Sequence, residues 1–151
     1  MNCQIPYKKS KNGFTLVEVI VVVVIFIIFI GVSERALFSF QSRSNLEIAT
    51  ANLVESLRHA KANAQQVQGD SKWGVEISGN QITVFSGLSY ATRNTALDQE
   101  SSLTNGVLSS GLSEVVFEKV TGTTLNYGTI TLSGSYGNKV ITINAKGTIT
   151  Y

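Results

Sequence analysis

An unbroken apolar run near the N-terminus constrains this chain more than any other feature. Residues 19–32 are all apolar or glycine, and across residues 14–33 the only polar side chains are Thr15, Glu18 and Ser33. A helix of this length spans about 30 Å, which is the hydrocarbon thickness of a bilayer. The run therefore predicts a transmembrane helix over residues 14–33 and argues against an ordinary soluble globule.

The composition excludes several classes of function. The chain has 12 Lys+Arg against 10 Asp+Glu, so it lacks the strong basic field that nucleic-acid binding favours. Cys3 is the only cysteine and His59 the only histidine, which rules out a disulfide within the chain and leaves any histidine-based metal site or triad to His59 alone. No phosphate loop, zinc spacing or nucleophile elbow is present. We expect no enzyme activity, no cofactor, no metal and no nucleic-acid partner.

A short basic flank precedes the apolar run. Lys8, Lys9 and Lys11 lie in residues 1–13, which contain no acidic residue. Positive charge next to a membrane helix favours the cytoplasmic side. The flank therefore predicts a single-pass protein of the cytoplasmic (inner) membrane, in contact with lipid, whose residues after 33 form a domain outside the cytoplasm.

Three interpretations of this segment compete. The first is a plain signal anchor. The second is a secretory signal peptide, in which Gly31 and Ser33 are the small residues before the cleavage site. Against it, the apolar core of this chain is longer than the roughly 7–15 residues that are usual in such signals. The third must explain Glu18, because a carboxylate inside a membrane helix costs about 2.5–3.5 kcal/mol and such residues are functional by default.

Cleavage between Gly13 and Phe14 would explain Glu18. The new amino group of Phe14 would lie at a helix N-terminus, where a cation opposes the helix dipole and a carboxylate one turn on offsets it. Glu18 of one chain could then meet the Phe14 amine of another. Because each charge is costly alone in lipid, the pairing would favour assembly and set the stagger between helices.

The stretch KKSKNGFTLVEVIVVVVIF resembles the class III signal of type IV pilins and type II secretion pseudopilins. The resemblance implies a prepilin peptidase/N-methyltransferase that removes residues 1–13 as a cytoplasmic leader by cutting after Gly13 and then methylates Phe14. It also implies that Glu18 recruits subunits. The partners implied are other pilins or pseudopilins, in homo- and hetero-assembly, and an inner-membrane assembly platform; the product would be a periplasmic or cell-surface filament.

Residues 34–68 predict an amphipathic helix that continues into the globular domain. Apolar side chains recur there at three- and four-residue steps, which indicates one buried stripe, made of Leu46, Ala49, Leu53, Leu57, Ala60, Ala64 and Val67. Gly69 is a typical stop signal after a helix. We therefore expect a helix over residues 14–68.

Residues 69–151 predict a β-rich domain. The alternation in residues 73–78 and 81–85, on either side of Gly79-Asn80, indicates a hairpin with a type II′ turn. Residues 86–112 read as loops with room for one short strand. Further strands are expected at residues 114–120, 129–133, 139–144 and 148–151, with a Gly/Ser turn at 134–138. The fold class expected is α+β, a pilin-like plan in which the long N-terminal helix packs on a C-terminal antiparallel sheet.

The order of these elements is similar to the GspH/FimT branch of pseudopilins and minor pilins. Phe117, Gly122 and Gly147 stand at the places where that branch has a phenylalanine strand, a glycine turn and a glycine in the short last strand. The chain departs from DNA-binding relatives of the branch because it ends in GTITY, without a basic tail. It also cannot form the C-terminal disulfide of many type IV pilins.

The leading functional hypothesis is a structural subunit, a minor pilin or pseudopilin of a type IV pilus or type II secretion pseudopilus. The alternative is a competence or adhesion pilin that binds DNA or a surface ligand through exposed loops 86–112 and 133–138. A third hypothesis is an anchored or secreted domain that acts alone. Asp98 and Glu100 in a polar loop suit solvation as well as acid–base chemistry.

Overall fold

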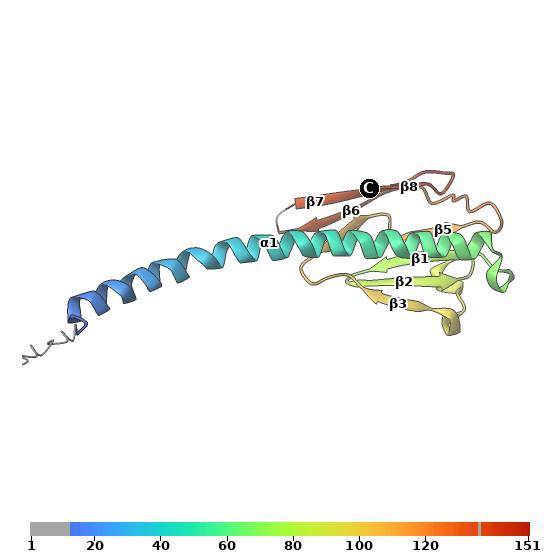
Figure 1. Ribbon diagram of the computed structural model, residues 1–151. Coiled ribbons are helices and arrows are strands. Elements are labelled where there is room, and N and C mark those ends of the chain that lie inside the picture. The colour runs from blue at the N-terminus through green and yellow to red at the C-terminus, as the bar shows by residue number, and fades with distance from the viewer. Residues whose placement is uncertain (1–12, 136) are drawn as a thin grey trace, which may run out of the picture. The chain divides into compact units, whose positions relative to one another are not determined.

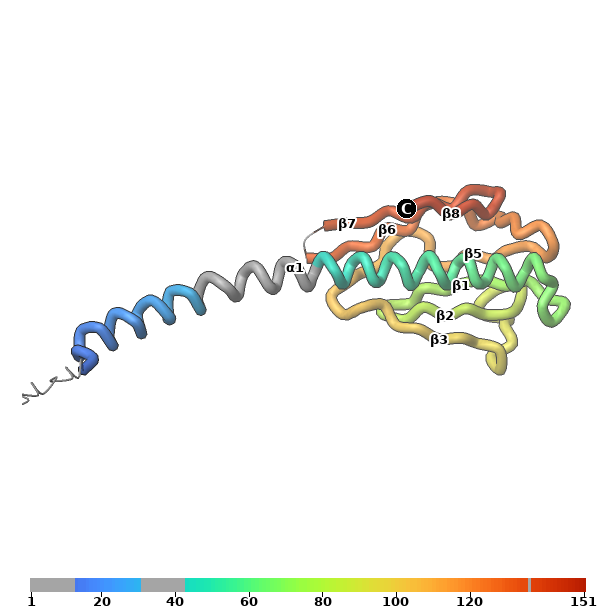
Figure 2. Tube along the Cα trace, viewed as in Figure 1, coloured from blue at the N-terminus to red at the C-terminus, as the bar shows by residue number. Residues whose placement is uncertain are grey.

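The computed structural model describes residues 13–135 and 137–151, with only the backbone described for residues 31–42 (Figure 2). The chain forms two units, residues 1–37 and residues 38–151. Of the expected leader, only Gly13 lies within the described residues.

One long helix, α1, extends over Leu16–Gln65 (Figure 1). The expected bounds of 14–68 were too wide at both ends. At the C-terminal end, Val67 and Gly69 take left-handed φ angles of 55° and 67°, which cannot continue a right-handed helix. Residues Gln68–Asp70 form a short 3-10 turn, η1, instead.

The predicted apolar stripe of the second half of α1 is confirmed. Leu53, Leu57, Ala60 and Ala64 are fully buried, whereas Val67 is only half-buried because it lies beyond the helix end. Regular side-chain burial along one face is what an amphipathic helix against a core requires. Within the unit of residues 38–151, α1 therefore supplies one wall of the core.

Eight strands are found in the described part of the chain: β1 Trp73–Ser78, β2 Gln81–Ser86, β3 Gln99–Ser102, β4 Leu108–Gly111, β5 Glu114–Phe117, β6 Gly128–Gly134, β7 Gly137–Ile143 and β8 Ile149–Thr150. They pair into two four-stranded antiparallel sheets, with orders β3-β2-β1-β5 and β4-β6-β7-β8. The α+β class is confirmed, but the single expected sheet is wrong. The chain changes sheets three times, after β3, after β4 and after β5, so strands that are consecutive in sequence do not all pair.

The predicted hairpin is formed by β1 and β2. Ser78 pairs with Gln81, which leaves Gly79-Asn80 as the two-residue turn. Gly79 has φ 59°, whereas Asn80 is not among the residues with positive φ. Positive φ at the first turn position alone is the pattern of the predicted type II′ turn.

The segment 86–112 is more structured than expected. It contains β3 in one sheet, β4 in the other, and two short 3-10 turns, η2 (Tyr90–Thr92) and η3 (Thr95–Leu97). β3 has the sequence QESS and all four of its residues are exposed. An edge strand of this kind carries no apolar alternation, and the period-two signal therefore missed it.

Two other strand boundaries differ from expectation. β5 ends at Phe117 rather than at Val120, because Val120 turns with φ 67° and its N–H donates to the carbonyl of Ala64 at 3.1 Å. β6 ends at Gly134 and β7 begins at Gly137, and these two residues pair with each other. The turn between the strands is therefore shorter than the expected turn at 134–138.

A single apolar core joins the helix and both sheets. Trp73, Val75 and Phe117 of the first sheet and Ile130 and Ile141 of the second lie in one buried cluster with the stripe of α1. Burial of side chains of this size removes large apolar areas from water, which is the main favourable term in folding. The 38–151 unit is thus one folded body with α1 packed against two sheets (Figure 1).

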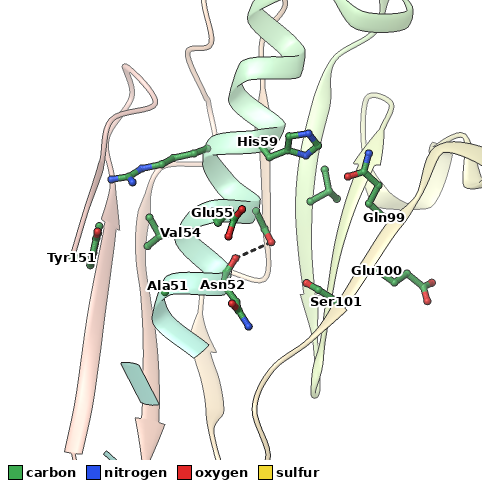
Figure 3. Close-up of a pocket in the computed structure, with 12 residues that line it drawn as sticks. Ala51, Asn52, Val54, Glu55, His59, Gln99, Glu100, Ser101 and Tyr151 are labelled. Atoms are coloured by element: carbon green, nitrogen blue, oxygen red, sulfur yellow. Dashed lines mark hydrogen bonds between the residues drawn. The ribbon is translucent and has the colours of Figure 1, made fainter. Parts of the chain in front are cut away.

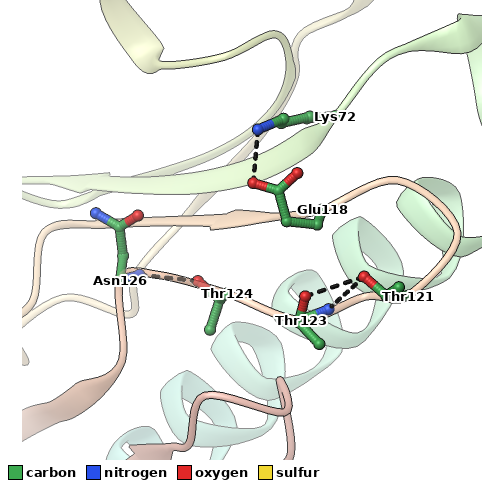
Figure 4. Close-up of polar contacts among 6 residues, drawn as sticks. All are labelled: Lys72, Glu118, Thr121, Thr123, Thr124 and Asn126. Atoms are coloured by element: carbon green, nitrogen blue, oxygen red, sulfur yellow. Dashed lines mark hydrogen bonds and ion pairs between the residues drawn. The ribbon is translucent and has the colours of Figure 1, made fainter.

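The loop between β5 and β6 is held by its own polar groups (Figure 4). Asn126 N–H donates to Thr124 Oγ1 at 3.1 Å, and the buried Thr124 donates its N–H to the carbonyl of Ala145 at 3.1 Å. Lys61 Nζ donates to the carbonyl of Gly147 at 2.9 Å. These contacts fix the last turns of α1 against the two loops that follow β5 and β7.

Candidate functional site

The segment that carries the predicted processing and assembly residues begins with a capped helix. The backbone N–H of Glu18 donates to Thr15 Oγ1 at 3.3 Å, and the N–H of Val19 donates to the carbonyl of Thr15 at 3.3 Å. Thr15 is therefore the N-cap residue of α1, and Glu18 occupies the third helical position. The Thr-x-x-Glu spacing is the pattern of a capping box. This spacing is visible in the sequence, although it was not used to predict the cap.

Gly13 and Phe14 lie upstream of the helix. Neither belongs to a helix or strand, and the side chain of Phe14 is 80% exposed. Among the described residues, a Cβ added at Gly13 would meet nothing within 4 Å. The bond predicted to be cut therefore lies in non-helical backbone.

Apolar side chains cover every face of α1 from Leu16 to Ile30. Their exposed fractions run from 43% at Val22 to 76% at Leu16. An amphipathic helix would show one apolar stripe, whereas a helix that is apolar all round needs cover from protein or lipid on all sides. Glu18 is the only charged residue in this stretch, and its side chain is exposed.

The sequence predicted a basic flank on the cytoplasmic side and a transmembrane helix for this segment. The basic flank of Lys8, Lys9 and Lys11 lies outside the described residues. Over the residues that the structure does describe, no helical stretch reaches the combination of length and apolar character that crossing a bilayer demands.

Asp98 and Glu100, the two acidic residues considered for acid–base chemistry, lie in different environments. Asp98 Oδ2 accepts a hydrogen bond from Arg93 Nε at 2.7 Å, and this bond raises the pKa of Arg93. Arg93 also stacks over the ring of Tyr90, with its guanidinium carbon 3.8 Å from the ring centroid. Glu100 is exposed on β3. Asp98 therefore serves to hold the loop after β2.

A groove of about 930 Å³ lies beside α1 in the 38–151 unit (Figure 3). The exposed face of the helix forms its floor, and β3 and the C-terminal Tyr151 stand on either side. Arg58 lies 5.6 Å from the ring centroid of Tyr151. The charged side chains in the lining are Glu55, Arg58 and Glu100, and His59 and Tyr151 also line the groove.

His59 is exposed in this groove. Among the described residues, no three His, Cys, Asp or Glu side chains gather in a way that could hold a metal ion. Arg58 shares the lining with the acidic residues Glu55 and Glu100, so the groove does not form the cationic track that phosphates need.

Phe117, Gly122 and Gly147, the three residues on which the resemblance to the GspH/FimT branch depends, lie close together in the structure. A Cβ added at Gly147 would lie 2.1 Å from the carbonyl oxygen of Gly122 and 3.3 Å from a ring carbon of Phe117. Both glycines have positive φ, 64° at Gly122 and 69° at Gly147. This close approach of two backbones gives the glycines a structural reason.

Comparison with known proteins yields one match. A family described as the prokaryotic N-terminal methylation motif matches residues 8–33. No curated protein matches the chain, and no solved structure matches it. The matched residues include the basic flank, Gly13, the capped start of α1 and Glu18. The chain therefore carries a type IV prepilin-like signal at its N-terminus.

Proposed function

We propose that this chain is a structural subunit, a minor pilin or pseudopilin, of a type IV pilus or type II secretion pseudopilus. One observation carries the proposal: a helix that is apolar and exposed on every face from Leu16 to Ile30, with Glu18 as its only charge. Such a surface is unstable in water and has to be covered by lipid or by neighbouring subunits. The motif over residues 8–33 supports this use of the helix.

Processing comes first in this proposal. A prepilin peptidase adds water across the peptide bond between Gly13 and Phe14, which leaves a carboxylate on Gly13 and an amine on Phe14. The same enzyme then transfers a methyl group from its methyl donor to that amine. The non-helical backbone of Gly13 and Phe14 and the exposed side chain of Phe14 support access to this bond.

Assembly follows through Glu18. After cleavage, the methylated amine of Phe14 stays cationic and lies next to the first turn of α1. Glu18 of one subunit pairs with this amine of another, because each group is poorly solvated in lipid without the other. The pairing sets the axial position of an incoming subunit, and the apolar faces supply the contact area.

The location and partners follow from the same steps. The chain is held in the cytoplasmic membrane by residues 14–33, with residues 34–151 outside the cytoplasm, until the inner-membrane platform passes it into a filament of sibling subunits. Removal from lipid needs no cofactor on this chain, since the energy is supplied by partner motors.

Substitution of Glu18 tests the proposal. In cells that assemble the sibling subunits, Glu18→Ala and Glu18→Gln should insert and be processed, but their incorporation into filaments should fall at least ten-fold. Leaving one member of a desolvated charge pair alone costs about 3–5 kcal/mol, which exceeds a ten-fold effect. Glu47→Gln is the matched control, because Glu47 is an exposed glutamate in the 38–151 unit. Normal incorporation of Glu18→Ala would refute the assigned role.

The salt dependence of DNA binding distinguishes a DNA-binding pilin from a structural subunit. Phosphate contacts weaken steeply as salt rises, so measured DNA retention at low salt that disappears at high salt would favour the alternative. The mixed charges of the groove beside α1 give this alternative no support.

A further inference from the structure

We propose that Thr15 is a positioning residue for leader cleavage: by capping α1 it keeps the Gly13–Phe14 peptide bond outside the helix, where a peptidase can reach it. The inference rests on the proposed function and adds a residue that decides how well this chain serves as a substrate. It depends on the geometry of three consecutive residues and the first turn of α1.

The hydroxyl of Thr15 and the backbone carbonyl of Phe14 compete for one hydrogen-bond donor, the N–H of Glu18. In the structure, the N–H of Glu18 donates to Thr15 Oγ1 at 3.3 Å. If the helix extended upstream, the same N–H would donate to the carbonyl of Phe14, four residues earlier, as in any α-helix. The threonine hydroxyl satisfies this donor without the extension, so the helix can begin at Leu16.

Helix extension would remove the cleavage site. With one further hydrogen bond upstream, the N–H of Val17 would donate to the carbonyl of Gly13, which is the carbonyl that the peptidase must attack. A carbonyl inside a helix is engaged in a hydrogen bond and flanked by neighbouring side chains, whereas exposed irregular backbone is the preferred site of proteolysis. In the structure, Gly13 and Phe14 lie outside any helix, no described residue approaches an added Gly13 Cβ within 4 Å, and Phe14 is 80% exposed.

The chemistry of Thr15 suits this task better than that of its neighbours. It is the only hydroxyl residue between Lys11 and Ser33. Serine, threonine, asparagine and aspartate are the residues that cap helix N-termini, whereas valine and alanine do not. Near a membrane the loss of a cap matters more, because an unpaired N–H is costly without water and favours the extended helix.

The test compares variants that keep or remove the cap. Full-length chains with Thr15, Thr15→Ser, Thr15→Asn, Thr15→Val and Thr15→Ala are placed in lipid vesicles with a prepilin peptidase, and the rate of appearance of Phe14 as an N-terminus is measured. Valine has the shape of threonine without its acceptor, so Thr15→Val should lower kcat/KM roughly five-fold or more, with alanine at least as low. Serine and asparagine should restore the rate to within about two-fold of the wild type.

A second measurement reports on the helix itself. In Thr15→Val, the amide of Val17 should exchange with solvent more slowly than in the wild type, because it acquires the carbonyl of Gly13 as its partner. Equal cleavage rates for threonine and valine, or a slow rate for serine, would overturn the inference. Failure of the wild type to be cut after Gly13 would overturn the proposed function instead, and the two failures are read from different samples.

Discussion

Glu76 lies directly opposite Glu114 on the neighbouring antiparallel strands β1 and β5. The two carboxylates project from the face opposite to the one that carries Val75 and Val115, which belong to the core. Oε2 of Glu76 is buried without a hydrogen-bond partner within the described residues, whereas Glu114 Oε1 accepts from the N–H of Tyr90 at 3.0 Å. Burial, and secondly the charge of Glu114, raise the pKa of Glu76.

This pair predicts a domain that loses stability as pH rises. A carboxyl whose pKa is raised in the folded state binds its proton more tightly there than in the unfolded chain. The destabilisation by Glu76 is therefore absent below the ordinary pKa of 4.5, and it grows as the pH rises from that value to the raised pKa of the folded state. Glu76→Gln should raise the stability at pH 7 by roughly 0.2–1 kcal/mol, the scale of a cross-strand pair, and should change it less at pH 4.

Thermal unfolding of the full chain in detergent at the two pH values measures this effect. Glu55→Gln, which removes an exposed glutamate on α1, is the matched control. A stabilisation by Glu76→Gln that is equal at both pH values would contradict the account of the pair.

The contact between Gly122 and Gly147 predicts that the second glycine is irreplaceable. Gly147→Ala would bring a Cβ within 2.1 Å of the Gly122 carbonyl oxygen at a φ of 69°. Gly106→Ala separates the two causes, because Gly106 also has a positive φ, 83°, but nothing lies within 4 Å of its added Cβ. Backbone strain alone costs about 1–2 kcal/mol, so denaturant unfolding should show Gly147→Ala to be destabilised clearly more than Gly106→Ala.

Equal losses in the two alanine variants would mean that the loops after β5 and β7 do not approach each other as the structure has them.

The stripe of α1 predicts a large difference between two positions five residues apart. Leu53 is fully buried and Ile48 is 48% exposed on the same helix. Leu53→Ala should lower the free energy of unfolding by about 2–5 kcal/mol, because it leaves a cavity as well as losing apolar contact. Ile48→Ala should cost well under half as much, as measured by denaturant titration. A similar cost at both positions would show that the helix face packed on the sheets is misassigned.

Gly13 predicts a block of processing without a fold defect. Gly13→Val introduces a side chain where an added Cβ meets nothing among the described residues, so the folded domain should keep the thermal stability of the wild type. Cleavage should nevertheless be lost, because the obstacle would lie in the peptidase. Immunoblotting for the longer precursor measures the outcome, and unaltered processing would place the cut at another bond.

The structure also shows which features of such a chain are readable from sequence. The buried stripe was predicted because three- and four-residue steps such as Leu53 to Leu57 are imposed by the pitch of a helix. The β1–β2 hairpin was predicted because alternation and a Gly-Asn turn are local signals. The end of α1 was misplaced, since Val67 adopts a left-handed conformation that side-chain type does not announce.

Features that depend on tertiary pairing were not readable. Alternation tells which face of a strand is buried but not which strand lies beside it, so the two sheets could not be told from one. The exposed sequence of β3 carries no apolar signal at all. The contact of Gly122 with Gly147 joins residues from two separate loops. The cap at Thr15 was readable from the Thr-x-x-Glu spacing, which shows that a functional segment also obeys ordinary helix rules.

The central claim, that this chain is cut and assembled as a prepilin, is tested most directly by the mass of its N-terminus. Protein is purified from cells that contain the prepilin peptidase, and its N-terminal peptide is analysed by mass spectrometry. The account predicts a mature chain that begins at Phe14 and carries one added methyl group. A chain that still begins at Met1, or one that begins at Glu34 after a secretory cut, would contradict it.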